Sequence, residues 1–139
     1  MHGYIPVGKT KDQGWEIGVR RTFPISPEAA WTLLMTPPGL GLWLGQGVTV
    51  PFQAGATFVT AEGTRGEIRS CHAGSLIRLR WQPRDWNVES TLQIRVHAAK
   101  TGATISVHHE RLENGEQRAA MQQHWSDVLA QLSTLIATE

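Results

Sequence analysis

The side chains best suited to chemistry lie close together near the end of one segment. His108 and His109 are adjacent, and Arg111 follows two residues later. The alternation of Ile105 and Val107 predicts a strand whose inward face also carries His109 and Arg111, whereas His108 points outward. Two adjacent histidines on opposite faces cannot chelate one metal ion. His109 is therefore either a half-buried histidine that is hydrogen-bonded to a neighbour, or a ligand-binding or proton-transfer residue.

Two arginines are candidates for binding an anionic group of a ligand. Arg21 belongs to the inward set of an alternating segment that runs from Trp15 to Phe23, and Arg111 is predicted to lie beside His109. A guanidinium group can hold a carboxylate through two parallel hydrogen bonds. The plainer alternative places Arg21 at the sheet edge, with its stem packed and its head in water.

Six tryptophans form the second set of candidate residues. Large aromatic rings commonly fill the core, but an apolar wall with a few polar groups is also the usual form of a small-molecule site. Core filling is the favoured role, and both roles can hold in one protein. The residues predicted to face inward, and thus to line a cavity, are Trp31, Trp43, Phe58, Ile68, Leu79, Trp81, Leu92, Ile94, Val107, His109, Met121 and Trp125, with Arg21 and Arg111 as polar anchors.

Other reactive groups and motifs are few. Cys71 is the single cysteine, which excludes an internal disulfide and suits a reducing compartment, and its alternation with Glu67 and Arg69 predicts the solvated face of a strand. The sequence contains no G-x-S-x-G, P-loop, H-E-x-x-H or paired C-x-x-C motif. We therefore expect neither a bound metal nor a resident cofactor.

The segment after Phe23 predicts a helix with defined ends. Ser26 is a good N-cap, and Pro27 suits the first helical position because its missing N–H costs nothing there. The Thr-Pro-Pro-Gly cluster at residues 36–39 ends this helix. A short helical turn over Leu40–Leu44 then presents Trp43.

The rest of the chain predicts strands followed by one long helix. The last segment, Glu116–Ala137, has an apolar stripe of the width expected for a helix that packs on a core. The only apolar surface large enough to cover this stripe is the concave face of a curved antiparallel sheet. With Trp15–Phe23, the predicted strands of that sheet are Thr57–Thr60, Arg65–His72, Ser75–Gln82, Val88–Ala98 and Ala103–Leu112.

Length and charge limit the class of protein. The 139 residues suit a single domain, with residues 1–14 as an N-terminal extension and 15–137 as the folded core. Thirteen basic and twelve acidic residues leave a net charge of +1, so electrostatics do not favour nucleic acid or an anionic membrane as a partner. The sequence shows neither a signal peptide nor a membrane span. We expect a cytoplasmic protein.

Several short motifs resemble the START-like superfamily, also called SRPBCC or helix-grip domains, in the branch named for activators of the heat-shock chaperone ATPase. The resemblance implies an α+β helix-grip fold, in which a curved antiparallel sheet of about six strands wraps around a long C-terminal helix and two short helices lie between the first and second strands. The motifs are WEIGVRRTFPISPEAAW at Trp15–Trp31, PPGLGLWLG at Pro37–Gly45, G-x-x-F at Gly55–Phe58, RGEI at Arg65–Ile68, IRLRW at Ile77–Trp81, HER at His109–Arg111 and HWSDVLAQL at His124–Leu132.

Three functions are compatible with this resemblance, because the superfamily includes lipid carriers, aromatic cyclases and chaperone activators. The first is a non-catalytic domain that encloses a small hydrophobic or aromatic molecule between the C-terminal helix and the sheet. The second is a protein-interaction module similar to the chaperone-ATPase activators. The third is a polyketide-cyclase-like enzyme that uses His109 with Arg111. The residue pattern leaves the ligand and the oligomeric state open.

Overall fold

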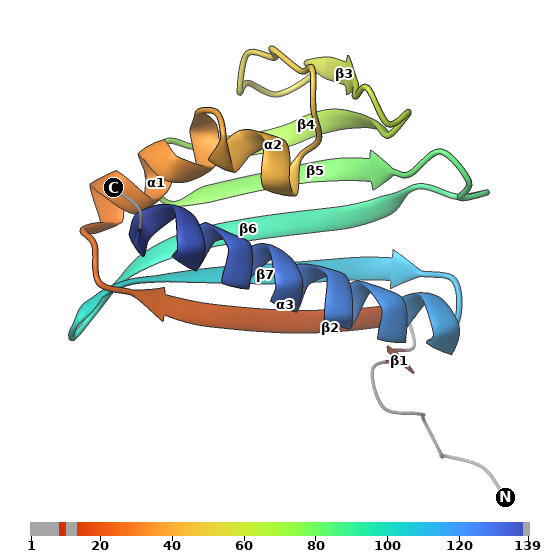
Figure 1. Cartoon of the computed structure of the whole chain (residues 1–139). Helices are drawn as coiled ribbons and strands as arrows, with labels where there is room; N and C mark the ends of the chain where they lie inside the picture. Colours follow the sequence, from red (N-terminus) through yellow and green to blue (C-terminus); the bar gives the residue numbers. More distant parts are fainter. Residues whose placement is uncertain (1–8, 11–13, 138–139) are drawn as a thin grey trace, which may run out of the picture.

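One antiparallel sheet forms the first layer of the fold, and helix α3 lies across one of its faces (Figure 1). The computed structural model describes residues 9–10 and 14–137. Within them the strand order is β1-β2-β7-β6-β5-β4-β3. We call the face that contacts α3 the inner face and the opposite one the outer face. The strands are β1 (Lys9–Thr10), β2 (Gly14–Phe23), β3 (Thr57–Val59), β4 (Arg65–His72), β5 (Leu76–Gln82), β6 (Ser90–Ala99) and β7 (Gly102–Leu112), and the helices are α1 (Pro27–Met35), α2 (Gly39–Trp43) and α3 (Gly115–Ala137).

The predicted helix-grip fold is confirmed. The two short helices lie between β2 and β3, and six strands follow the predicted segments closely. The two-residue strand β1 adds a seventh, paired with the start of β2. Most of the predicted N-terminal extension, residues 1–14, lies outside the described residues. None of the helices in the described part of the chain is long and apolar enough to cross a membrane.

Helices α1 and α2 are held together by local hydrogen bonds. The Ser26 hydroxyl oxygen accepts a bond of 3.0 Å from the Ala29 N–H at the start of α1, as the sequence predicted. At the other end of α1, the carbonyl of Leu34 cannot find a partner within the helix. The indole N–H of Trp43 donates to it at 2.7 Å, and this bond fixes α2 against α1.

The core lies between α3 and the inner face of the sheet. The buried residues of α3 are Trp125, Val128, Leu129 and Leu132. They belong to one hydrophobic cluster with inner-face residues such as Leu79, Leu92 and Ile94, whose side chains are almost completely buried. Burying each such leucine contributes about 1.5–3 kcal/mol to folding. The centre of the helix–sheet interface is therefore filled by side chains.

Two strand irregularities move predicted residues to the other face. The register of β4 shifts between Ile68 and Ser70, so Cys71 pairs with Ile77. Cys71 is half-buried and packs against the core, contrary to the predicted solvated position, and burial raises the pKa of its thiol. In β7, Arg111 has a left-handed backbone with φ of 63°, and the pairing with β2 shifts nearby. The predicted inward position of Arg111 is wrong, because this bulge turns its side chain to the outer face.

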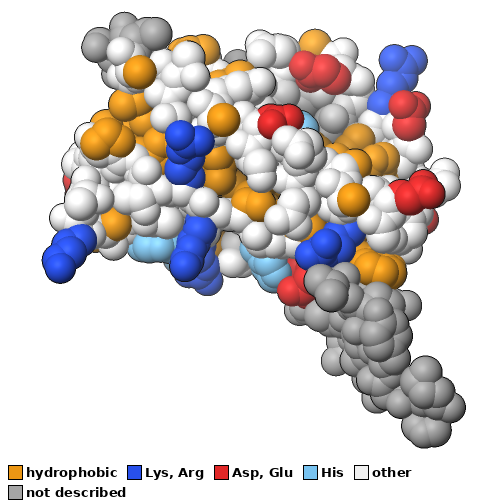
Figure 2. Space-filling model, turned by 60° about the horizontal axis from the view of Figure 1, so that its bottom comes forward, with side chains coloured by type: hydrophobic (Ala, Val, Ile, Leu, Met, Phe, Trp, Pro, Cys, Tyr) orange, Lys and Arg blue, Asp and Glu red, His pale blue; other side chains and the backbone are white. Residues whose placement is uncertain are grey.

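The molecular surface carries both signs of charge, as the near-neutral composition indicates. On the face shown in Figure 2, basic and acidic side chains are interspersed, and hydrophobic side chains reach the surface between them in small groups.

The contact between α1 and α2 leads to a stability prediction. A Cβ atom at Gly39 would lie 1.9 Å from the carbonyl oxygen of Leu33, which is backbone and cannot move aside cheaply. Gly39→Ala should therefore lower the free energy of unfolding by about 1–3 kcal/mol, as overpacking typically does. Gly41→Ala is the matched control in the same helix, because its Cβ would meet only the flexible side chain of Gln46. Urea denaturation of both variants measures the difference; equal midpoints would contradict the prediction.

Candidate functional site

A chain of buried hydrogen bonds crosses the core next to the site. The indole N–H of Trp125 on α3 donates to His109 Nδ1 at 3.0 Å. An indole nitrogen can only donate, so Nδ1 is the acceptor and the proton of the neutral imidazole sits on Nε2. His109 Nε2 then donates to the Ser90 hydroxyl at 2.7 Å. The Ser90 hydroxyl donates in turn to the carbonyl of Trp81 at 2.5 Å.

This arrangement gives His109 a structural role. Its side chain is 0 % exposed, and both ring nitrogens already have partners. Burial, together with the nearby His124 and His108, lowers the pKa of His109 to about 3. Both ring nitrogens are therefore occupied by protein partners in this structure, and neither is available to a ligand. Arg111 lies on the opposite face, so the pair of His109 and Arg111 that the cyclase-like alternative requires does not form.

A cavity of about 330 Å³ opens beside this hydrogen-bond chain. It lies where α2, the loop between β5 and β6, and α3 come together. Trp81 of β5 and Trp86 of the loop form one part of its wall, and Met121 and His124 of α3 form another. We call it the aromatic cavity. Its lining residues are Gly41, Leu42, Trp43, Leu44, Gly45, Glu62, Thr64, Trp81, Pro83, Trp86, Met121 and His124.

The aromatic rings around this cavity hold one another in place. Trp81 meets Trp86 edge to face, with ring centroids 5.8 Å apart, and it contacts Trp125 at 5.5 Å. Trp86 stacks on the buried His109 at 5.8 Å. These distances lie within the range in which aromatic pairs attract. The indole wall is thus supported from behind by the core.

Two buried polar atoms of the residues in this wall have no hydrogen-bond partner in the part of the chain that the structure describes. They are Nε1 of Trp81 and Nε2 of His124. Trp81 is only 6 % exposed, and an unsatisfied buried donor costs about 1–3 kcal/mol. Burial lowers the pKa of His124, although the charge of Asp127 opposes this. The His124 ring is therefore neutral at neutral pH.

The sequence itself identifies the family of this domain. A sequence model described as activator of Hsp90 ATPase homolog 1-like protein matches residues 24–137. The chain belongs to this family of Hsp90-ATPase-activator-like proteins. Among curated proteins, none matches the sequence significantly.

Solved structures share the fold of this activator-like domain at low sequence identity. CalU16 from Micromonospora echinospora has a TM-score of 0.76 and 16% identity, over 88% of this chain and 76% of that one. An HSP90 activator from Plasmodium falciparum has a TM-score of 0.76 and 18% identity, over 89% and 97% of the two chains. An AHSA1 protein from Silicibacter pomeroyi has a TM-score of 0.68 and 20% identity, over 88% and 98%. At these identities the likeness shows the fold alone.

The activator-like domain brings together only part of the predicted cavity set. Trp43, Trp81 and Met121 line the aromatic cavity. Trp31 is half-buried on α1, and Arg21 lines a shallow cavity of about 360 Å³ where β2 meets α3, consistent with the predicted edge position. The remaining predicted residues are buried in the core or, for His109, in the hydrogen-bond chain: Phe58, Ile68, Leu79, Leu92, Ile94, Val107, His109 and Trp125.

Sequence reasoning missed Trp86 and His124 as cavity residues. Trp86 lies in a polar loop that no periodicity describes, and its only signal is a tryptophan where turn residues are expected. His124 lies one residue before Trp125 and reads as a boundary position of the helical stripe.

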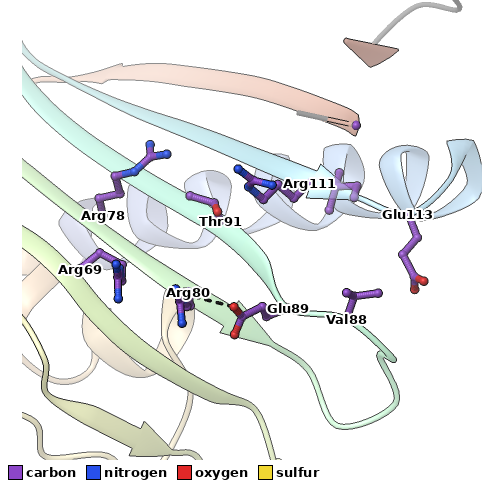
Figure 3. Close-up of a pocket in the computed structure, with 10 residues that line it drawn as sticks. Arg69, Arg78, Arg80, Val88, Glu89, Thr91, Arg111 and Glu113 are labelled. Carbon is purple, nitrogen blue, oxygen red and sulfur yellow. Dashed lines mark ion pairs between the residues drawn. The ribbon is translucent and has the colours of Figure 1, made fainter. Parts of the chain in front are cut away.

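A second, larger cavity of about 770 Å³ lies on the outer face of the activator-like domain. Arg69, Arg78, Arg80 and Arg111 surround it, with α3 on the far side of the sheet (Figure 3). Arg80 pairs with Glu89 at 3.2 Å and with Glu67 at 3.6 Å. Within the described part of the chain, Arg111 has neither an ion pair nor a side-chain hydrogen bond. We call this the arginine cavity.

One outer-face cluster has side chains of the kind that bind metals. Glu16, His108 and Glu110 each offer an atom within 4.8 Å of the others. His108 Nε2 lies 3.1 Å from a carboxylate oxygen of Glu16, and Arg78 binds Glu110 at 3.2 Å. The other carboxylate oxygen of Glu16 is buried and has no hydrogen-bond partner among the described residues.

The buried state of His109 predicts the stability of the domain in acid. The unfolded chain binds a proton at His109 below about pH 6.5, whereas the folded protein does so only near pH 3. The free energy of unfolding should therefore fall as the pH is lowered between these values, by up to about 1.4 kcal/mol per pH unit for this group. His109→Gln, which can still donate and accept, should show a shallower fall in urea denaturation from pH 7 to 4.

The exposed His97 provides the control for this experiment. His97→Gln should keep the pH dependence of the unchanged protein. If His109→Gln loses stability in acid as steeply as His97→Gln, then His109 is not held neutral by the fold.

Proposed function

We propose that this domain binds a small, apolar aromatic molecule in the aromatic cavity. The observation that carries the proposal is the preformed wall of Trp43, Trp81 and Trp86, closed by Met121 and His124 around about 330 Å³. This volume lies at the small end of the range for ligand pockets, and an apolar lining with a few polar atoms is typical of them. The cavity is too small for a long lipid chain but suits one or two fused rings.

The proposed site differs from a central cavity between helix and sheet. Leu79, Leu92 and Ile94 fill that centre, so a ligand would have to displace well-packed side chains. At the end of the interface between α2 and α3, the space already exists. We therefore place the ligand at this end, in a binding role rather than a catalytic one, in a protein of the cytoplasm.

A charged side chain in the cavity wall should weaken the binding of an apolar ligand. Met121→Glu places a carboxylate against the rings, and its desolvation should weaken the binding of naphthalene at least about tenfold. Gln122→Glu is the matched control, because Gln122 is the next residue on α3 and is exposed outside the cavity. The measurement is an NMR titration that follows the indole N–H signals of Trp81 and Trp86. No saturable shift in the unchanged protein, with naphthalene or its simple derivatives, would reject the proposal.

The arginine cavity favours a second candidate function, the binding of an acidic segment of a partner protein. Guanidinium groups from β4, β5 and β7 face the same space, and the free Arg111 can form a bidentate contact with a carboxylate. The structural likeness to an HSP90 activator makes an Hsp90-type chaperone the natural partner to test.

Loss of one arginine should weaken this second interaction measurably. Arg111→Gln should lower the affinity for an Hsp90-type chaperone by about two- to fivefold at low salt, as expected for one exposed ion pair. Arg95→Gln removes an exposed charge that does not line the arginine cavity and serves as the control. Biolayer interferometry on the immobilised domain gives both affinities. An absence of chaperone binding by the unchanged domain would remove this candidate.

A further inference from the structure

We propose that the ligand of the aromatic cavity is a neutral phenolic compound, whose hydroxyl group accepts a hydrogen bond from Trp81 Nε1 and donates one to His124 Nε2. This inference rests on the proposed aromatic-binding function and specifies its chemistry. It begins from two buried atoms that have no hydrogen-bond partner among the described residues, Trp81 Nε1 and His124 Nε2, which belong to side chains that line the cavity.

The indole N–H of Trp81 fixes one requirement on the ligand. Its only hydrogen-bonding capacity is donation, and the side chain that carries it is 94 % buried, since only 6 % is exposed. Buried donors in folded proteins almost always have an acceptor. The other tryptophans of this region follow that rule, because Trp43 donates to the Leu34 carbonyl and Trp125 donates to His109. Among the described residues, none supplies an acceptor to the N–H of Trp81, and we assign this acceptor to the ligand.

The imidazole of His124 fixes the second requirement. Its pKa is lowered by burial, so at neutral pH the ring has one nitrogen that accepts and one that donates. Its centroid lies 6.2 Å from that of Trp81, and both residues line the same cavity. We therefore place one small polar group between the two neighbouring rings, in contact with both nitrogens. A group that serves both nitrogens must accept from Trp81 and can donate to His124, and a hydroxyl does both.

The charge of the cavity fixes the third requirement. Glu62 is the one acidic residue among the lining residues, and no lysine or arginine is among them. Its carboxylate accepts from the backbone N–H of Gln46 at 3.1 Å. Although burial opposes ionisation, hydrogen bonds from the backbone of Glu62 and Gln46 and from Thr60 hold the pKa of Glu62 below its usual range. Glu62 is exposed, so solvent screens its charge, but a negative charge at the cavity mouth still favours a neutral phenol over an aromatic carboxylate.

Four naphthalene derivatives of nearly equal size separate these requirements. Naphthalene fills the cavity without a polar group, 2-methoxynaphthalene can only accept, 2-naphthol can accept and donate, and 2-naphthoate is an anion. The affinities are measured at pH 7 by the NMR titration of the indole N–H signals. We expect 2-naphthol to bind about tenfold or more tightly than naphthalene, since pairing two buried polar atoms is worth at least this ratio. We expect 2-methoxynaphthalene to fall between them and 2-naphthoate to bind most weakly.

Two variants test whether the preference for 2-naphthol depends on the side chain of His124. His124→Phe should reduce the advantage of 2-naphthol over 2-methoxynaphthalene to less than about twofold while naphthalene still binds. Trp86→Phe is the control, because it trims the apolar wall of the same cavity and should weaken all four compounds by similar factors. The signal of Trp81 Nε1–H should move downfield with 2-naphthol and not with naphthalene, which reports the new hydrogen bond directly.

The outcomes separate this inference from the proposed function. If none of the compounds binds, the aromatic-binding function itself is wrong. If naphthalene and 2-naphthol bind equally, the function stands but the phenol assignment fails, and a water molecule satisfies the two nitrogens. A preference for 2-naphthoate would also overturn the assignment. Because the compound series is measured on the unchanged protein, the test holds even if a variant does not fold.

Discussion

The direction of one hydrogen bond organises the interior of this protein. Because the indole of Trp125 can only donate, Nδ1 of His109 must accept and its Nε2 carries the proton. His109 Nε2 therefore donates to the Ser90 hydroxyl, and this hydroxyl donates to the carbonyl of Trp81. The chain joins α3 to three neighbouring strands. These polar groups are tolerated at the centre of an apolar core because each of them has a hydrogen-bond partner. The same bonds position the back of the wall against which Trp81 and Trp86 lie.

Because side chains fill the centre of the helix–sheet interface, the space for a ligand lies at one end of it, beside α2. The inner-face residues of β5 and β6 are almost completely buried in the same hydrophobic cluster as the apolar side chains of α3, so side chains fill the space between the helix and the centre of the sheet. At the α2 end, the large indole rings leave a space bounded by flat, rigid surfaces. Flat rings cannot rearrange to close such a space as aliphatic side chains can. The abundance of tryptophan thus serves both the core and the cavity.

Periodicity allowed most of the fold to be predicted. Strand and helix bounds followed from alternation and from capping residues such as Ser26, because these signals are local. Residues next to irregularities could not be placed in the same way. A single bulge in β4 or β7 reverses the face of every residue beyond it. The sequence around Cys71 and Arg111 contains no signal that predicts these bulges. For the site, the sequence indicated Trp43, Trp81 and Met121. It could not indicate Trp86, whose position depends on a loop, nor the hydrogen-bond order around His109, which depends on three elements meeting.

The hydrogen bond from Trp43 to Leu34 gives the aromatic cavity a particular mechanical character. A five-residue helix has no independent stability in water, so α2 keeps its shape through α1. Because the Trp43 indole is bonded to the last turn of α1, a molecule that contacts Trp43 in the cavity also acts on the end of α1.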